Sequence, residues 1–137
     1  MLELFKSKKK TDRVKILIVD DEPDLVSTIQ YRLEWSNCEV ITAANGKEGL
    51  EKVASERPDL VLLDTNMPVM NGHEMLRCLR EHQELKDTPV IMVTVICEPQ
   101  DIATASSYGI ADYVTKPFDF TELMEKIANA LKNKNTG

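Results

Sequence analysis

The alternation of five short apolar runs with stretches of helical periodicity is the feature that most constrains the fold. The apolar runs cover residues 14–19, 39–43, 59–63, 89–93 and 111–114. The last helical stretch shows its spacing in Phe120, Leu123, Met124, Ile127 and Leu131. Runs that are apolar at successive positions, such as residues 60–63, are typical of parallel strands covered on both faces. The alternation predicts an α/β fold of the doubly wound (βα)5 type, a three-layer sandwich with a five-stranded parallel sheet in the middle.

Smaller features indicate where helices begin and which residues pack. Asn45 and Gly46 are typical of a turn, so we expect the second helix to begin near Gly49. Trp35 and Met75 lie in helical stretches, and we expect both to be packing residues of their helices. These expectations concern local structure and do not alter the predicted fold.

Length and composition exclude several classes of protein. A chain of 137 residues has room for one domain of ordinary size. Its 42% hydrophobic content is too high for a disordered chain, and its apolar runs are far shorter than the roughly 20 residues that cross a bilayer. A net charge of −6 argues against nucleic acid as a partner. The three cysteines lack the spacing of a zinc site or a disulfide framework, so we expect a cytoplasmic protein without membrane association.

Charge is unevenly distributed along the chain. Residues 1–13 contain a cluster of lysines, whereas the rest of the chain is acidic. The final residues are polar and carry no apolar periodicity. We therefore interpret residues 1–13 as a basic, solvated leader, residues 14–133 as the folded domain and residues 134–137 as a polar tail.

Polar residues follow four of the apolar runs, where parallel strands would end. Asp20 and Asp21 follow the first run, Asp64 the third and Thr94 the fourth, and Lys116 lies just beyond the fifth. The carboxyl ends of parallel strands meet at one edge of the sheet, and functional crevices of doubly wound folds lie there. We therefore expect these five side chains to converge.

The residue types in this set indicate phosphoryl chemistry with a metal ion. Three carboxylates in one place repel one another unless a cation lies among them, and oxygen ligands suit Mg²⁺. The hydroxyl of Thr94 and the ammonium of Lys116 suit the oxygens of a phosphoryl group. One carboxylate would then be the nucleophile that forms an acyl phosphate, and Asp64 on a central strand is the best candidate.

These motifs resemble those of the receiver domain of bacterial two-component response regulators, over nearly all of residues 14–133. The matching segments are Asp20-Asp21-Glu22-Pro23, Asp64-Thr65-Asn66-Met67-Pro68, Val93-Thr94 and Thr115-Lys116-Pro117-Phe118. Each segment alone is weak, but together they occur in the family's order at the ends of the expected strands. The resemblance implies a CheY-like domain with the flavodoxin-like strand order 2-1-3-4-5.

The resemblance also implies a role for each acidic residue. Asp64 would accept a phosphoryl group from a phosphohistidine on a sensor histidine kinase or a histidine phosphotransfer protein. Asp21 and Asp64 would bind Mg²⁺ through their carboxylates, Asn66 through its backbone carbonyl and Asp20 through a water molecule. The implied chemistry is limited to self-phosphorylation from a phosphodonor and autodephosphorylation, so we do not expect an enzyme that acts on a separate substrate.

The remaining site residues would convert phosphorylation into a change of surface. By the same resemblance, Lys116 would pair with one phosphoryl oxygen and Thr94 would hydrogen-bond another. Tyr113 matches the aromatic residue that turns inward as the Thr moves. A downstream protein would bind the surface of the fourth helix, fifth strand and fifth helix, around Ile102, Tyr113 and Phe120.

The main alternative is a receiver-like docking module that works without phosphorylation. Val95 favours this alternative, because the family usually has a small residue there and a branched side chain would crowd access to Asp64. A phosphatase of the haloacid dehalogenase type would need an acid in place of Asn66. A flavodoxin would need a phosphate-binding loop rich in Ser, Thr and Gly after the first run, and residues 20–23 are of another kind.

Ile96 generates a prediction about the lifetime of the phosphorylated state. Many members of the family have a polar residue near the phosphoryl group at this position, and an apolar side chain cannot orient the attacking water. We expect a long-lived acyl phosphate, and Ile96→Glu should shorten its lifetime by up to about ten-fold, the effect of one hydrogen bond to a charged group. Intact mass after removal of the phosphodonor measures the decay. Faster decay in the unmodified chain than in Ile96→Glu would contradict the prediction.

Overall fold

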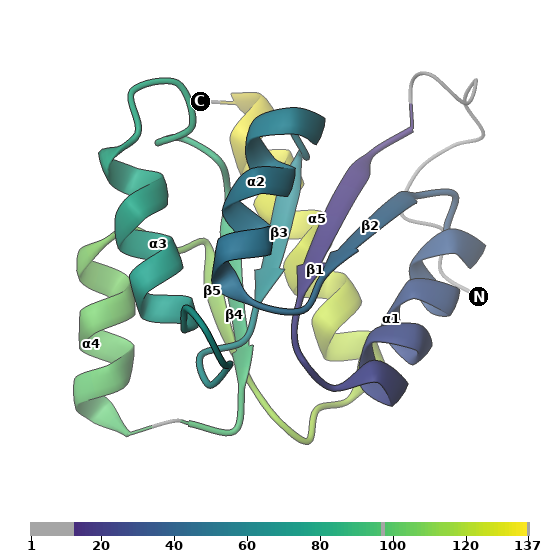
Figure 1. Ribbon diagram of the computed structural model, residues 1–137. Helices are drawn as coiled ribbons and strands as arrows, with labels where there is room; N and C mark the ends of the chain where they lie inside the picture. Colours follow the sequence, from purple (N-terminus) through teal and green to yellow (C-terminus); the bar gives the residue numbers. More distant parts are fainter. Residues whose placement is uncertain (1–12, 97, 137) are drawn as a thin grey trace.

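The computed structural model describes residues 13–96 and 98–136, and within them the strands form one parallel sheet (Figure 1). The strands are β1 (Lys15–Val19), β2 (Glu39–Ala43), β3 (Leu60–Leu63), β4 (Val90–Thr94) and β5 (Asp112–Thr115). Their order in the sheet is β2-β1-β3-β4-β5, and all paired strands run parallel. The predicted α/β class, strand order and doubly wound arrangement are confirmed.

The helices cover both faces of the sheet, as the prediction required. They are α1 (Pro23–Trp35), α2 (Gly46–Glu56), α3 (Gly72–Glu81), α4 (Pro99–Ser107) and α5 (Phe120–Thr136). In Figure 1, α1 and α5 lie on one face of the sheet and α2, α3 and α4 on the other. Helix α5 continues past residue 133, after which we expected a polar tail. Residues 1–12 of the predicted leader lie outside the described residues.

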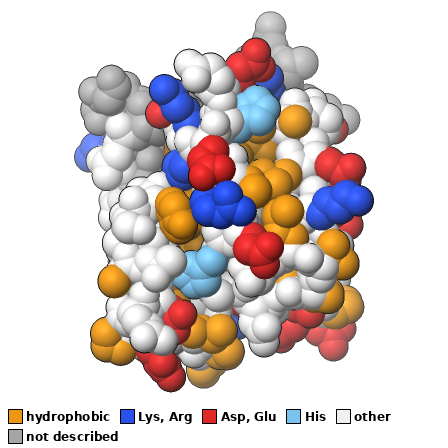
Figure 2. Space-filling model, turned by 60° about the vertical axis from the view of Figure 1, so that its left-hand side comes forward, with side chains coloured by type: hydrophobic (Ala, Val, Ile, Leu, Met, Phe, Trp, Pro, Cys, Tyr) orange, Lys and Arg blue, Asp and Glu red, His pale blue; other side chains and the backbone are white. Residues whose placement is uncertain are grey.

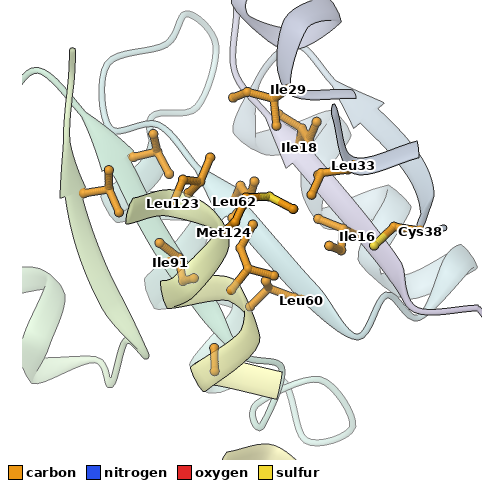
Figure 3. Close-up of a cluster of buried hydrophobic side chains, with 14 of the residues drawn as sticks. Ile16, Ile18, Ile29, Leu33, Cys38, Leu60, Leu62, Ile91, Leu123 and Met124 are labelled. Atoms are coloured by element: carbon orange, nitrogen blue, oxygen red, sulfur yellow. The ribbon is translucent and has the colours of Figure 1, made fainter. Parts of the chain in front are cut away.

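The core consists of two apolar clusters, one on each face of the sheet. In β1, Ile16 and Ile18 face α1 and α5, while Leu17 and Val19 face the opposite helices. Figure 3 shows the first cluster, where side chains of the central strands meet those of α1 and α5. Burial on both faces is the physical reason for the continuous apolar runs in the sequence. Within the described residues, no helix is long and apolar enough to cross a membrane.

Helix α2 begins three residues earlier than we expected. Asn45 is the N-cap, because its side-chain oxygen accepts a hydrogen bond of 2.9 Å from the backbone N–H of Glu48. Such a bond satisfies an amide of the first turn and starts the helix at Gly46. The predicted change of direction therefore lies at Ala44 and Asn45, whereas Gly46, which we assigned to the turn, already belongs to the helix.

Met75 and Trp35 give opposite results. Met75 is fully buried, so the prediction that it packs is confirmed. The side chain of Trp35 is 59% exposed, so the corresponding prediction for Trp35 is wrong. Trp35 is the last residue of α1 and lies two positions after the buried Leu33, which places it away from the sheet.

Gly72 generates a prediction, since a methyl group added there would lie 2.2 Å from the backbone oxygen of Asp64. Backbone cannot move aside as a side chain does, so Gly72→Ala should destabilise the fold by at least about 1–3 kcal/mol. Gly49→Ala is the matched control, because the nearest atom, at 2.8 Å, belongs to the flexible side chain of Met75. Urea unfolding measures both variants. An equal or smaller loss in Gly72→Ala would contradict the prediction.

Candidate functional site

The predicted acidic residues converge at the carboxyl ends of β1 and β3. These strands are neighbours, and Val19 lies opposite Leu63 in the register, so Asp20 and Asp64 follow side by side. Both aspartates are buried, whereas Asp21 is exposed. One carboxylate oxygen from each of the three lies within 4.8 Å of the others. The sheet register therefore assembles the acidic cluster that the sequence predicted.

Lys116 supplies the positive charge of this cluster. Its Nζ donates hydrogen bonds to Asp20 Oδ2 at 2.8 Å and Glu22 Oε1 at 2.9 Å, and lies 3.5 Å from Asp64 Oδ2. Only 8% of the lysine side chain is exposed. Lys116 follows β5, on the far side of β4 from Asp64, so its long side chain reaches across the end of β4.

Burial and charge act in opposite directions on the ionisable groups of the site. Burial raises the pKa of Asp20, and the hydrogen bond from Lys116 offsets only part of this increase. Burial alone would lower the pKa of Lys116, but its hydrogen bonds to Asp20 and Glu22, together with the negative charges of Asp20 and Asp64, outweigh burial, and the pKa is raised. The lysine is therefore firmly protonated, while negative charge on Asp20 carries an energetic cost.

Thr94 and Tyr113 are connected through the peptide groups of Ile96. Thr94 is fully buried, and its hydroxyl accepts a hydrogen bond of 3.2 Å from the backbone N–H of Ile96. The hydroxyl of Tyr113, on β5, donates a hydrogen bond to the backbone carbonyl of Ile96. The structure thus brings together the two residues that we expected to move together.

The loop after β3 holds Asp64 in place. The carboxylate Oδ1 of Asp64 accepts a hydrogen bond of 2.7 Å from the backbone N–H of Thr65. Gly72, at the start of α3, donates its N–H to the carbonyl of Thr65 at 2.9 Å and closes the loop. Asn66 lies in this loop with its side chain exposed. The metal-binding role of its backbone carbonyl stays a prediction.

Glu22 is the site residue that we did not predict. It is the N-cap residue of α1, but its side chain makes no capping bond within the described residues and reaches Lys116 instead. Its backbone N–H donates to Asp20 Oδ1 at 3.0 Å. The available signal was the run of three acids before Pro23, which is longer than helix capping requires.

An apolar pocket of about 390 Å³ adjoins the acidic cluster. Its lining residues come from α1 and its N-cap, from the segments after β4 and β5, and from the start of α5: Glu22, Leu25, Thr28, Ile29, Val95, Lys116, Pro117, Phe118 and Phe120. The side chain of Val95 is 61% exposed. Val95 and Lys116 thus line the same pocket next to the acidic cluster.

The surface of α4, β5 and α5 differs in one residue from our expectation. Ile102 is exposed on α4, and Tyr113 is half-buried on β5. Phe120 was wrongly included, because its ring packs toward α1, with the guanidinium carbon of Arg32 5.0 Å from the ring centroid and Phe118 at 6.2 Å. Figure 2 turns α3 and α4 forward and shows apolar and charged side chains interspersed on this side of the molecule.

Sequence comparisons agree with this geometry. The family model described as the response regulator receiver domain matches residues 16–128. Response regulator ArlR of Staphylococcus saprophyticus is 41% identical over 120 residues, which are 88% of this chain and 53% of ArlR. The alkaline phosphatase synthesis transcriptional regulatory protein PhoP of Bacillus subtilis is 39% identical over 118 residues, 86% of this chain and 48% of PhoP. The chain spans about half the length of these relatives.

Solved structures show the same likeness over nearly the whole domain. The CheY-like response regulator receiver domain protein of Methanospirillum hungatei has a TM-score of 0.86 at 30% identity, covering 91% of this chain and 98% of that chain. Chemotaxis protein CheY4 of Vibrio cholerae has a TM-score of 0.76 at 31% identity, and the match covers 88% of this chain and 98% of CheY4. Given the family match, the fold and the converging aspartates and lysine, this chain belongs to the response regulator receiver domain family.

Proposed function

We propose that this domain accepts a phosphoryl group on Asp64 from a phosphohistidine, in a reaction that depends on Mg²⁺. The donor would be a sensor histidine kinase or a histidine phosphotransfer protein, and the phosphorylated form would bind a downstream protein through α4, β5 and α5. The observation that carries the proposal is the ammonium of Lys116 between the buried carboxylates of Asp20 and Asp64. This arrangement offers a nucleophile and a cation for the incoming phosphoryl oxygens.

Asp64 would act as the nucleophile in the transfer. A carboxylate oxygen of Asp64 forms a bond to phosphorus while the P–N bond of the phosphohistidine breaks, and the imidazole nitrogen leaves with the electron pair. The hydrogen bond from the Thr65 N–H fixes the orientation of the carboxylate before attack. Lys116 neutralises part of the negative charge that the phosphoryl group brings.

The acidic cluster fits a divalent cation by its donor set. Asp20, Asp21 and Asp64 offer hard oxygen ligands, and their mutual repulsion falls when a cation binds. By the family resemblance, the backbone carbonyl of Asn66 and a water on Asp20 would complete the protein's contribution. When bound, Mg²⁺ would neutralise the phosphoryl oxygens.

The peptide groups of Ile96 offer a route from the phosphoryl group to the surface. As the hydroxyl of Thr94 turns to a phosphoryl oxygen, the hydrogen bond from the Ile96 N–H weakens. The carbonyl of Ile96 holds the hydroxyl of Tyr113, so a shift of this segment changes the support of the tyrosine. Tyr113 packs in the cluster that also contains Ala105 of α4, and its movement therefore reaches α4 and β5.

The proposal extends to the location of the domain and to its contacts. We propose a cytoplasmic domain without direct contacts to nucleic acid or membrane, because the acidic composition suits neither surface. Its chemistry would be confined to its own phosphorylation and dephosphorylation. The pocket between α1 and the segment after β5 would receive apolar side chains of the phosphodonor beside Lys116.

Phosphorylation by a small phosphodonor tests the proposal directly. With acetyl phosphate and Mg²⁺, we expect the intact mass to rise by one phosphoryl group. Asp64→Asn, or omission of Mg²⁺, should abolish the increase, because the variant lacks the nucleophile and the metal-free site repels the donor. A histidine phosphotransfer protein loaded with phosphate serves as a second donor. If neither donor adds mass to the unmodified chain, the phosphorylation-independent docking module is the better interpretation.

Lys116 generates a prediction about metal affinity, because its charge competes with Mg²⁺ for the carboxylates. Lys116→Met should bind Mg²⁺ at least about ten-fold more tightly, because a unit positive charge repels a divalent ion in the same cluster by about 2 kcal/mol even at the dielectric constant of water. Lys132→Met, at an exposed position of α5, is the matched control. Isothermal titration calorimetry measures both. Unchanged or weaker binding by Lys116→Met would show that the lysine and the metal do not compete.

A further inference from the structure

The carboxylates of Asp20 and Glu22 compete with that of Asp64 for the ammonium of Lys116. An ammonium has three N–H donors. In this structure the short hydrogen bonds go to Asp20 at 2.8 Å and Glu22 at 2.9 Å, whereas Asp64 lies at 3.5 Å, the limit for a hydrogen bond. The lysine is therefore closer to Asp20 and Glu22 than to Asp64, which would carry the phosphoryl group.

We propose that Glu22 is a positioning residue that holds Lys116 away from Asp64 until a phosphoryl group arrives, an inference that rests on the proposed function. Glu22 is well placed for this role. Its backbone N–H is fixed by Asp20, and its side chain reaches the lysine from the start of α1, where both residues line the pocket. The side chain makes no other hydrogen bond within the part of the chain that the structure describes.

Solvent exposure determines which of the two short ion pairs of Lys116 breaks more easily. The Lys116–Asp20 pair is buried on both sides, with 8% and 5% of the side chains exposed. In the Lys116–Glu22 pair, the glutamate is 58% exposed. Water readily replaces the lysine as the partner of an exposed carboxylate, so the bond to Glu22 breaks at low cost. Glu22 thus stabilises the resting position of Lys116 without locking it.

Removal of this contact should speed phosphorylation. Without the bond to Glu22, one N–H donor of Lys116 is free for the phosphoryl oxygens. The activation barrier of phosphorylation then no longer includes the cost of breaking the Lys116–Glu22 ion pair. An exposed pair contributes modestly, so we expect the rate of phosphorylation to rise about two- to five-fold. Because this change in rate is small, the test depends on comparing the rates of several variants.

Two substitutions separate positioning from simple charge repulsion, because Glu22 also repels an anionic phosphodonor. Glu22→Asp keeps the charge but shortens the side chain by one methylene, so the carboxylate no longer reaches Lys116. Glu22→Gln removes the charge but keeps an oxygen at the same reach. Positioning predicts faster phosphorylation in Glu22→Asp, whereas repulsion alone predicts a faster rate in Glu22→Gln and an unchanged rate in Glu22→Asp.

The rate experiment uses acetyl phosphate with Mg²⁺ on the full chain, followed by intact mass. Asp24→Asn is the matched control, because it removes one negative charge from the first turn of α1 at an exposed position. We expect Glu22→Asp to react about two- to five-fold faster than the unmodified chain, and Asp24→Asn to react at the rate of the unmodified chain. An unchanged rate in Glu22→Asp would overturn the inference.

A second measurement tests the contact without metal or phosphodonor. The side-chain ammonium of Lys116, labelled with ¹⁵N, should give a slowly exchanging NMR signal in the metal-free chain, because it is buried and hydrogen-bonded. Glu22→Asp should shift or broaden this signal, and Asp24→Asn should leave it unchanged. An unchanged signal in Glu22→Asp would overturn the inference. If the unmodified chain takes up no phosphoryl group while this signal responds, the proposed function fails and the Glu22–Lys116 contact stands.

Discussion

The burial of Asp20 and Asp64 beside each other is the constraint on which the rest of the structure depends. Two carboxylates in a low-dielectric environment are unfavourable unless a positive charge lies between them, and Lys116 provides this charge at 2.8 and 3.5 Å. The raised pKa of Asp20 shows that compensation is incomplete. The donor set therefore suits further positive charge, which the proposed divalent cation would supply.

The sheet brings the two carboxylates together, and the apolar packing of its strands stabilises the fold that holds them there. β1 and β3 are apolar on both faces and lie at the centre of the sheet, so the segments after them cannot separate. The close approach of Gly72 to the backbone of Asp64 fixes the loop after β3 from the other side. Burial of the two apolar clusters stabilises the fold enough to tolerate strain in the acidic cluster. The candidate site thus lies where the parallel strands end, whereas the stabilising core lies where they pass between the helices.

Features that depend on chain periodicity could be predicted from the sequence, whereas features that depend on the direction of single side chains could not. Continuous apolar runs and the polar residues after them were sufficient to predict a parallel sheet and the meeting of Asp20, Asp64 and Lys116, whereas the strand order was implied by the family resemblance. The outward face of Trp35 and the turn of Phe120 toward Arg32 depend on the packing of α1 against its neighbours. The helix start at Asn45 and the contact of Glu22 depend on which of several local hydrogen bonds a polar side chain makes. Composition does not decide among such bonds.

The groups that would respond to a phosphoryl group already have partners in the resting structure. Lys116 is bonded to Asp20 and Glu22, and the hydroxyl of Thr94 accepts from the Ile96 N–H. Each such bond contributes on the order of 1 kcal/mol net, so the resting arrangement is stable yet separated by only a few kcal/mol from one in which the same groups turn to phosphate. A ligand shifts such an equilibrium only by its difference in affinity for the two states. Since a dianionic phosphoryl group accepts stronger hydrogen bonds than an exposed carboxylate does, rearrangement of these few bonds would be sufficient for the proposed switch.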